Sequence, residues 1–349
     1  MTKTLAVMFL WLGFAGPGIA QSGDAAETQT MRPVIRGQHA AVSSMRAQAS
    51  EAARRILESG GNAFDAAVAG QAVLGLTDFA DNGLGSDAVV LTYVAREKKV
   101  YSVNAEPRAP KLATIEWYEK NNGGRIPESD GLLSGGLPGV VDAWYVLLDR
   151  WGTMSFEQVL EPAIELAESG FPLGESSAGD IASTKKILKY PTTVKIYLPN
   201  GRLPKPGDVF RNPDLARTLR KLVEAEQATK AKGRHEALRA ARDRFYQGDI
   251  ARELASFSEA NGGLFRYDDF AEYSAEVESP VSIDYRGYRI YKNPSASQGP
   301  TELIALNLLE GFDLKALGHN TPDFLHTNVE AMKPRRWCEG NREYCGQEL

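Results

Sequence analysis

The sequence predicts a layered α/β protein in which helices pack against pairs of strands. Two runs rich in β-branched residues, 88–94 and 100–103, flank a charged turn, which is typical of a hairpin. Runs with helical spacing of apolar residues come before and after the strand pairs, so strands and helices do not alternate as in a Rossmann fold. With 349 residues, 43% of them hydrophobic, the chain can bury a sizeable core.

The first two predicted elements are consecutive helices. Apolar residues at helical spacing begin at Ala47, and the glycine pair Gly60 and Gly61 closes the first helix. Asn62 can cap a second helix over residues 63–76. This second helix is so rich in alanine and valine that we expect it to pack on all sides.

Two more helices and a loop follow the hairpin. Pro138 and Gly139 open a helix that runs to residue 150, and residues 156–169 form the next helix. Prolines and glycines punctuate residues 190–213, which predicts a surface excursion that contributes nothing to the core.

The last predicted elements are a second strand pair and a helix. Residues 281–284 and 288–291 alternate like paired strands around a turn at Arg286 and Gly287. Residues 302–309 then read as a buried helix.

The charge balance argues against nucleic acid or an anionic membrane surface as a partner. The chain carries 45 acidic and 40 basic residues, for a net charge of −5, and phosphate recognition needs a dense basic face. Residues 217–244 hold nine Lys or Arg against four Asp or Glu, but the charges alternate and no aromatic residue lies among them. This pattern favours a solvated helical face, so a small-molecule partner is the better expectation.

The N-terminus reads as a secretory signal peptide. Residues 1–20 contain Lys3, an apolar run of about ten residues and a small-residue end at Ala20. The run is shorter than the roughly 20 residues that a membrane-spanning helix needs. We therefore predict a secreted or periplasmic protein with no membrane span after cleavage, in which residues 21–40 form a mobile lead-in.

Cofactor and metal motifs are not found in the sequence. The two cysteines, Cys338 and Cys345, lie near the C-terminus without nearby histidines, and the chain has four histidines in all. We therefore expect no metal and no cofactor. Ser86 and Asp87, behind a glycine turn, are a nucleophile candidate. The alternative interpretation is purely structural, a tight turn that needs glycine for positive φ.

Several segments together resemble the gamma-glutamyltranspeptidase family. The most recognisable is ASEAARRILESGGNAFDAAVA, and NAEPRAPKLAT and LLSGGLPGVVDAW follow in the family's order. The resemblance spans residues 41–333. In the tail, residues 334–349, Pro334 is expected to break a helix that the family continues. This change predicts a truncation or a reading-frame error.

The resemblance implies an N-terminal-nucleophile hydrolase fold, a four-layer αββα sandwich whose precursor cuts itself into a large and a small subunit. The first threonine of the small subunit is then the nucleophile, and the reaction is attack on a γ-glutamyl amide such as glutathione with transfer of the acyl group to water or an amino acid. This chain corresponds to the large subunit, so the resemblance implies an incomplete sandwich, a small subunit as heterodimer partner and no catalytic residue here. We expect the isolated chain to be inactive, and we do not expect Thr192 or Thr193 to replace the nucleophile.

The chain departs from the family pattern at the substrate position. The family's arginine, which holds the substrate α-carboxylate, falls at Glu106, and Arg108 lies two residues further on. Ser86 and Asp87 stand where the family has a further glycine. These differences leave two alternatives open, an acylase of the same fold for another γ-acyl substrate and a non-catalytic binding or pairing module.

Overall fold

The computed structural model describes residues 36–127, 131–294 and 297–340, without the side chains of residues 200 and 334–340. Residues 1–41 and 42–349 form two separate units, and the second holds all the helices and strands given below. The predicted signal peptide lies outside the described residues. Of the predicted lead-in only residues 36–40 are described, and they are exposed.

Two antiparallel hairpins form where the sequence predicts them. Strands β1 (Ala88–Val94) and β2 (Lys99–Ala105) pair along their full length, and the short β5 (Glu276–Glu278) adds to β2 in a sheet of order β1-β2-β5. Strands β6 (Val281–Tyr285) and β7 (Tyr288–Lys292) form a separate ribbon. Arg286 and Gly287 join them with φ values of 51° and 85°, the left-handed turn that suits a two-residue hairpin loop.

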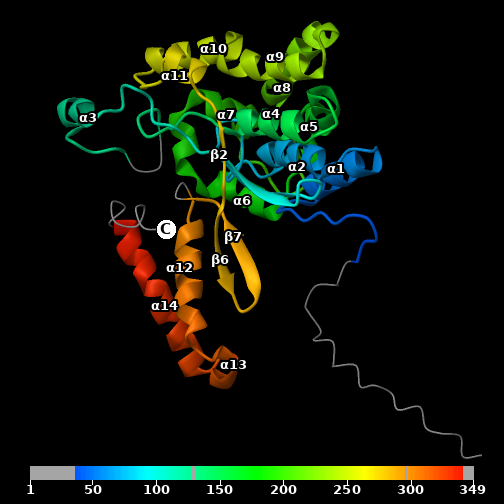
Figure 1. The fold of residues 1–349 in the computed structure, drawn as a ribbon. Coiled ribbons are helices and arrows are strands. Elements are labelled where there is room, and N and C mark those ends of the chain that lie inside the picture. Colours follow the sequence, from blue (N-terminus) through cyan, green and yellow to red (C-terminus); the bar gives the residue numbers. More distant parts are fainter. Residues whose placement is uncertain (1–35, 128–130, 295–296, 341–349) are drawn as a thin grey trace, which may run out of the picture. The chain divides into compact units, whose positions relative to one another are not determined.

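The two predicted helices form as α1 (Ala47–Glu58) and α2 (Ala63–Thr77), which pack side by side (Figure 1). The Asn62 side chain accepts hydrogen bonds from the Phe64 and Asp65 amides at 2.8 and 3.2 Å. The buried Asp65 carboxylate accepts hydrogen bonds from the amides of Asn62, Thr153 and Met154. This capping box therefore links the start of α2 to the residues just before the helix at 156–169, which is distant in sequence.

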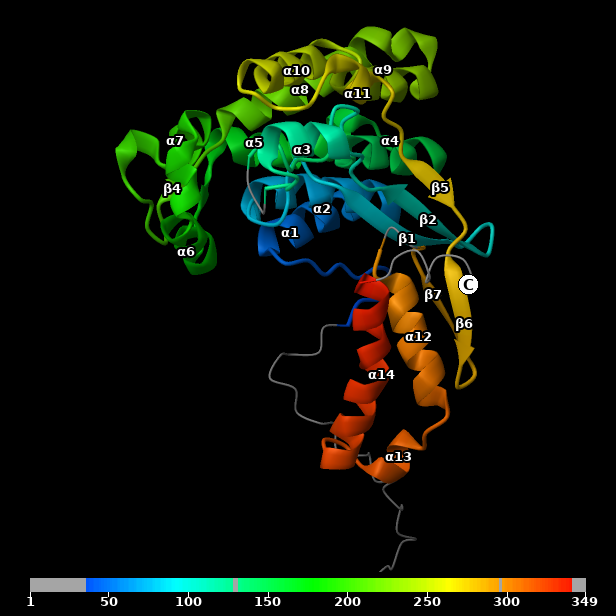
Figure 2. The same cartoon turned by 90° about the vertical axis from the view of Figure 1, so that its left-hand side faces the viewer.

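The remaining helices of the main core lie in layers. Figures 1 and 2 show α8 (Pro213–Thr229), α9 (Arg234–Tyr246), α10 (Asp249–Ala260) and α11 (Tyr267–Ala271) stacked on α4 (Val140–Arg150) and α5 (Phe156–Ser169). These in turn cover α2. The predicted helices at 139–150 and 156–169 are confirmed, and the charged segment 217–244 forms the antiparallel pair α8 and α9.

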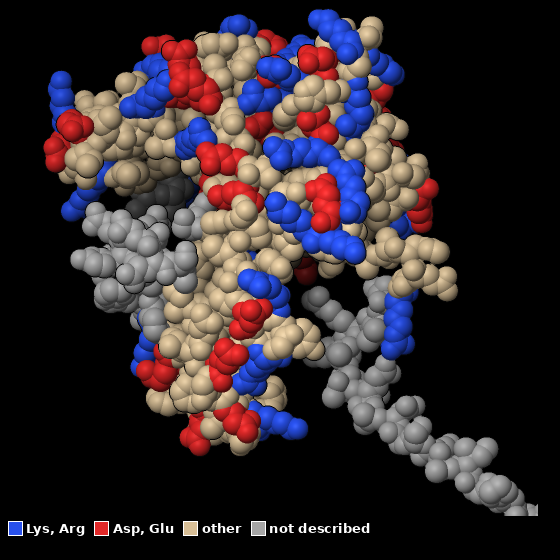
Figure 3. Space-filling model, viewed as in Figure 1, with Lys and Arg blue, Asp and Glu red and all other residues tan. Residues whose placement is uncertain are grey.

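All but two of the charged side chains in residues 217–244 are exposed or half-exposed. On the face drawn in Figure 3, basic and acidic side chains are interspersed over the helices. Glu226 and Arg242, however, are buried at 3% and 9% exposure. Glu226 accepts hydrogen bonds from the Phe156 and Glu157 amides at 2.8 and 2.9 Å, so it caps the N-terminus of α5. The alternation of charge in the sequence did not indicate that Glu226 and Arg242 are buried.

The predicted surface excursion, residues 190–213, contributes to a second core, which corrects the expectation. This part of the chain holds α7 (Pro191–Tyr197) and β4 (Val209–Phe210). Strand β4 pairs with β3 (Phe171–Pro172), which comes before α6 (Glu175–Ser183). Leu198 and Phe210 are 8% and 4% exposed and pack with Phe79 and Tyr197. Prolines and glycines set the path of the backbone here without keeping its apolar side chains out of a core.

The C-terminal helices are less buried than predicted. In α12 (Gly299–Glu310) only Leu303 and Leu309 are buried, so the expected buried helix is wrong. After α13 (Leu314–Leu317), α14 (Pro322–Gly340) continues past Pro334, and the expected helix break at this proline is also wrong. Large apolar side chains of α12, α14 and the turn between them expose about half of their surface: Leu308 45%, Phe312 50%, Leu325 51%, Val329 50% and Met332 48%.

Across the ranges that the structure describes, no helix is both long and apolar enough to cross a membrane.

Candidate functional site

The candidate site lies on the loop that leaves β2, residues 105–110, which we call the site loop. The Leu137 amide holds its backbone by donating to the Arg108 carbonyl at 2.8 Å. The next residue after the loop, Lys111, donates its amide to Asp269 at 3.0 Å. Gly139, just before α4, has no room for a Cβ, which would collide with the Ala105 carbonyl and the Tyr273 hydroxyl. Glycine is thus required for α4 to begin against the end of β2.

Glu106 is the acidic residue at the position where the resemblance places the family's arginine. Its side chain is partly buried, and no hydrogen bond or ion pair of its carboxylate is found among the described residues. Partial burial raises the pKa of Glu106, and the negative charge of Asp87 raises it further. The charge of Asp87 therefore acts on Glu106, and both residues are acidic.

Arg108 turns toward β5. One of its terminal nitrogens, Nη2, donates to the Ser274 carbonyl at 3.1 Å and to Glu276 Oε1 at 2.9 Å. The Arg108 and Glu276 side chains are 49% and 64% exposed, so this ion pair is open to solvent and weak. An incoming carboxylate could compete with Glu276 for the guanidinium at little cost.

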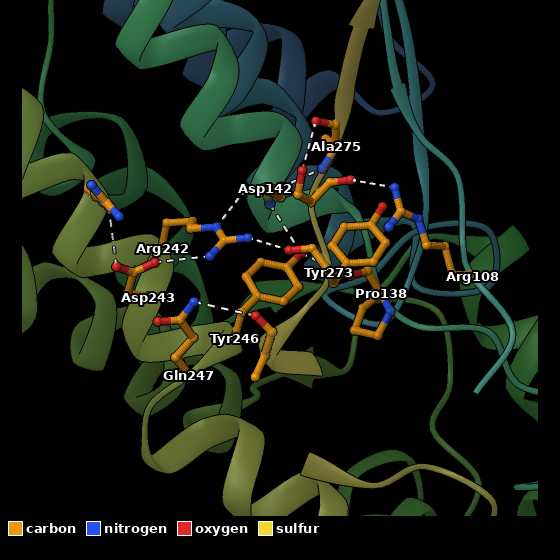
Figure 4. Close-up of polar contacts among 12 residues, drawn as sticks. Arg108, Pro138, Asp142, Arg242, Asp243, Tyr246, Gln247, Tyr273 and Ala275 are labelled. Atoms are coloured by element: carbon orange, nitrogen blue, oxygen red, sulfur yellow. Dashed lines mark hydrogen bonds and ion pairs between the residues drawn. The ribbon is translucent and has the colours of Figure 1, made fainter. Parts of the chain in front are cut away.

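A buried ion pair lies behind the site loop (Figure 4). Arg242 Nε, from α9, donates to Asp142 Oδ1, from α4, at 2.7 Å, and the two side chains are only 11% and 4% exposed. Asp142 Oδ2 accepts from the Ala275 amide at 2.5 Å, and Arg242 also donates to the Tyr273 carbonyl. Both charges are therefore paired and hydrogen-bonded, which is what a buried pair requires.

Two stacked tyrosines complete this arrangement. The rings of Tyr246 and Tyr273 lie 5.3 Å apart at 14°, and Figure 4 shows Tyr273 between Tyr246 and Arg108. The Tyr246 hydroxyl donates to the Pro138 carbonyl at 2.9 Å, and the Tyr273 hydroxyl donates to the Glu106 carbonyl at 3.0 Å. Burial and the nearby Asp142 charge raise the pKa of both phenols, so they stay protonated donors at neutral pH.

Ser86, the predicted nucleophile candidate, makes hydrogen bonds that stabilise the local fold. The Ser86 hydroxyl donates to the Gly83 carbonyl at 2.7 Å, and the Ser86 carbonyl accepts from the Gly139 and Val140 amides at the start of α4. Ser86 therefore ties a turn to a helix. The reason expected for the glycines of this turn is wrong, because Gly83 and Gly85 are not among the glycines with positive φ.

Thr192 and Thr193 lie in α7, beside the second core and not on the site loop. Asp269, which holds the Lys111 amide, lies in the first turn of α11. Cys345 is outside the described residues, and Cys338 lies where side chains are not described. No group of three or more His, Cys, Asp or Glu side chains in the described ranges could hold a metal ion.

Sequence reasoning missed Asp142, Arg242 and Tyr273. A signal was present at Asp142, a single acid inside the otherwise apolar run VVDAWYVLL, because an isolated charge on a buried face needs a partner. The partner itself, Arg242, is 100 residues away in a strongly charged segment. No local pattern distinguishes it from its exposed neighbours.

Comparison with known proteins identifies the family. The family model described as gamma-glutamyltranspeptidase matches residues 49–347. The chain belongs to the gamma-glutamyltranspeptidase family. It is 37% identical over 289 residues to a glutathione hydrolase-like YwrD proenzyme of Bacillus subtilis, and 31% identical over 306 residues to the glutathione hydrolase proenzyme of Escherichia coli. These alignments cover 82% and 86% of this chain but 51% and 50% of the relatives, so the chain spans about half their length.

Solved structures agree. The gamma-glutamyltranspeptidase of Helicobacter pylori superposes with a TM-score of 0.80 at 28% identity, over 90% of this chain and 86% of that one. A cephalosporin acylase of Bacillus halodurans superposes with a TM-score of 0.72 at 32% identity, over 81% and 51% of the two chains. The predicted gamma-glutamyltranspeptidase resemblance and the N-terminal-nucleophile hydrolase fold, mixed in helix and strand, are both confirmed.

Proposed function

We propose that this chain forms the large-subunit part of an enzyme that cleaves γ-glutamyl amides, such as glutathione, and transfers the acyl group to water or to an amino acid. The observation that carries the proposal is the family match over residues 49–347. Several relatives are named glutathione hydrolases, which supports this reaction class.

The site loop is the proposed contact with the acyl group. Arg108 is its exposed cation, and a guanidinium pairs well with a carboxylate such as the one a γ-glutamyl group carries. Glu276 occupies one edge of this guanidinium in an exposed ion pair, which a substrate carboxylate can replace. Arg108 therefore acts as the carboxylate anchor in this proposal, and Glu106 lines the same region.

The proposed partner is a small-subunit-like polypeptide that supplies the nucleophilic threonine. The half-exposed apolar side chains of α12 and α14 support this, because contiguous exposed apolar side chains often mark a surface that a partner covers. In this proposal the partner covers these side chains, and the chain alone is inactive. No cofactor or metal is needed for this chemistry.

The signal-peptide pattern of residues 1–20 supports a secreted or periplasmic location. Extracellular γ-glutamyl amides are then the accessible substrates.

A second candidate is an acylase that takes a γ-acyl group without an α-carboxylate. Glu106 and Asp87 favour it, because two carboxylates near the acyl group would repel a third. The similarity to a cephalosporin acylase supports the same alternative.

The test measures hydrolysis of γ-glutamyl-p-nitroanilide and of butyryl-p-nitroanilide, whose acyl group carries no carboxylate. The 349-residue chain is assayed alone and after co-expression with the small-subunit part of the YwrD relative. Turnover of the γ-glutamyl compound by the complex, lost in Arg108→Gln, is the expected result. Turnover of the butyryl compound but not the γ-glutamyl compound favours the acylase. Turnover by the chain without the small-subunit part contradicts the proposed inactivity, and turnover of neither compound overturns both candidates in favour of a pairing module.

A further inference from the structure

Residues 273–275 contact the site loop on one side and the buried ion pair on the other. The Tyr273 hydroxyl donates to the Glu106 carbonyl at 3.0 Å, and the Ser274 carbonyl accepts from Arg108 at 3.1 Å. The Ala275 amide donates to Asp142 at 2.5 Å. Three consecutive residues thus join the site loop to α4 through one continuous set of hydrogen bonds.

The buried side of this connection is firmly held. Arg242 reaches the Tyr273 carbonyl from α9 while it pairs with Asp142, so two helices fix the backbone of residues 273–275. In the described part of the chain, no buried side-chain nitrogen or oxygen is left without a hydrogen-bond partner. The backbone position of Tyr273 is therefore set from the core, independently of the site loop.

We propose that Tyr273 is a positioning residue for the site loop. Its hydroxyl fixes the Glu106 carbonyl relative to the Asp142–Arg242 pair, and this sets where the side chains of Glu106 and Arg108 project. The inference rests on the proposed function in one respect, that the site loop meets the acyl group. Tyr273 acts through the Glu106 backbone and does not itself touch the substrate.

The ring of Tyr273 is held without its hydroxyl, which makes the role testable. It stacks on Tyr246 at 5.3 Å, and the Arg108 guanidinium lies 5.6 Å from its centroid. Tyr273→Phe therefore removes the bond to Glu106 and keeps both stacking contacts. The backbone bonds of residues 273–275 to Arg242 and Asp142 also remain.

The first measurement is amide hydrogen exchange on the 349-residue chain. In Tyr273→Phe we expect the amides of Glu106 and Leu137 to exchange roughly three- to tenfold faster, the factor that one net hydrogen bond gives. The Lys111 amide, held by Asp269 at 3.0 Å, keeps its wild-type rate. This pattern would place the effect in the part of the loop that Tyr273 holds.

Tyr267→Phe is the matched control. The Tyr267 hydroxyl also donates to a backbone carbonyl, that of Gln247, at 2.8 Å, and it lies outside the site loop. This variant loses the same kind of bond and leaves the Glu106 and Leu137 amides unchanged. Unchanged exchange at these amides in Tyr273→Phe overturns the proposal, and so does equally faster exchange throughout α4, which would mark a merely structural role.

The second measurement separates binding from chemistry. In a preparation that hydrolyses γ-glutamyl-p-nitroanilide, Tyr273→Phe raises KM roughly three- to tenfold and keeps kcat within about twofold, because a misplaced loop weakens ground-state and transition-state binding alike. A loss of kcat with unchanged KM contradicts the proposal. If the wild type shows no turnover, the proposed function fails, and the exchange measurement still decides the role of Tyr273.

Discussion

Two regions of the chain differ in how far their large apolar side chains are buried. Around α4, α5 and α8, large residues such as Phe156, Leu160 and Leu222 are 0% exposed. Around α12 and α14, residues of the same kind, such as Leu308 and Leu325, are 45% and 51% exposed. The first region closes a core by itself, and the second presents apolar surface.

Helices α2 and α12 show that composition does not cause this difference. Both are strongly apolar, yet nine residues of α2 are buried against two of α12. Helix α2 has α1, α4 and α5 against it, whereas α12 has α14 and the β6–β7 ribbon. Burial is a property of what lies next to a helix, and the exposed side of α12 is consistent with a partner that the proposed function requires.

The largest effect is expected at the buried ion pair of the first region. Asp142→Asn removes the buried counterion of Arg242 and leaves it only the more exposed Asp243, and we expect a loss of about 3–5 kcal/mol in the free energy of unfolding. Urea denaturation followed by circular dichroism measures it. Glu276→Gln, which removes a partner from the exposed Arg108 pair, is the control and should cost about 0–1 kcal/mol.

Matched leucines compare the two regions directly. Leu222→Ala in α8 opens a cavity in a closed core and should cost about 2–5 kcal/mol. Leu308→Ala in α12 removes a side chain that is 45% exposed, so we expect a clearly smaller loss in the isolated chain. Thermal unfolding of both variants checks this, and equal losses would show that α12 is as well packed as α8.

A smaller effect is expected where the site loop meets α4. Gly139→Ala forces a methyl group against the Ala105 carbonyl and the Tyr273 hydroxyl, and overpacking of this kind costs about 1–3 kcal/mol. Gly179→Ala is the opposite case, since nothing lies within 4 Å of its new Cβ in α6. It should stabilise the chain by about 0.5–1 kcal/mol, because alanine is the better helix former. Denaturation midpoints of the two variants should therefore move in opposite directions.

The smallest effect concerns the pH dependence of Glu106. Its pKa is raised by partial burial and by Asp87, so the folded state binds this proton more tightly than the unfolded chain does. The resulting stability is present below the ordinary glutamate range and is lost as pH rises through the raised pKa. The free energy of unfolding of wild type should therefore fall slightly between pH 4 and neutral pH relative to that of Glu106→Gln, which cannot ionise at this position. Asp87→Asn should lower the Glu106 pKa in an NMR titration.

The sequence was a good guide wherever a local rule was sufficient. The capping box at Asn62, the turn at Arg286 and Gly287 and the alternation of β1 and β2 each depend on residues within a few positions of one another. The family was also readable, because its motifs follow in order along most of the chain. Residues 190–213 were misread, since turn residues report the backbone path and not what the side chains between them contact.

The sequence predicted only part of the candidate site, because its other residues are far apart in the chain. Glu106 and Arg108 stand out by their place in a motif, so the sequence by itself determined which loop to consider. Only the tertiary structure decided that Arg108 turns to Glu276, that Tyr273 holds the Glu106 carbonyl, and that Asp142 pairs with Arg242. These contacts join residues about 100 to 170 positions apart, and a buried charge or a phenol finds its partner through the packing of whole helices, which no local pattern encodes.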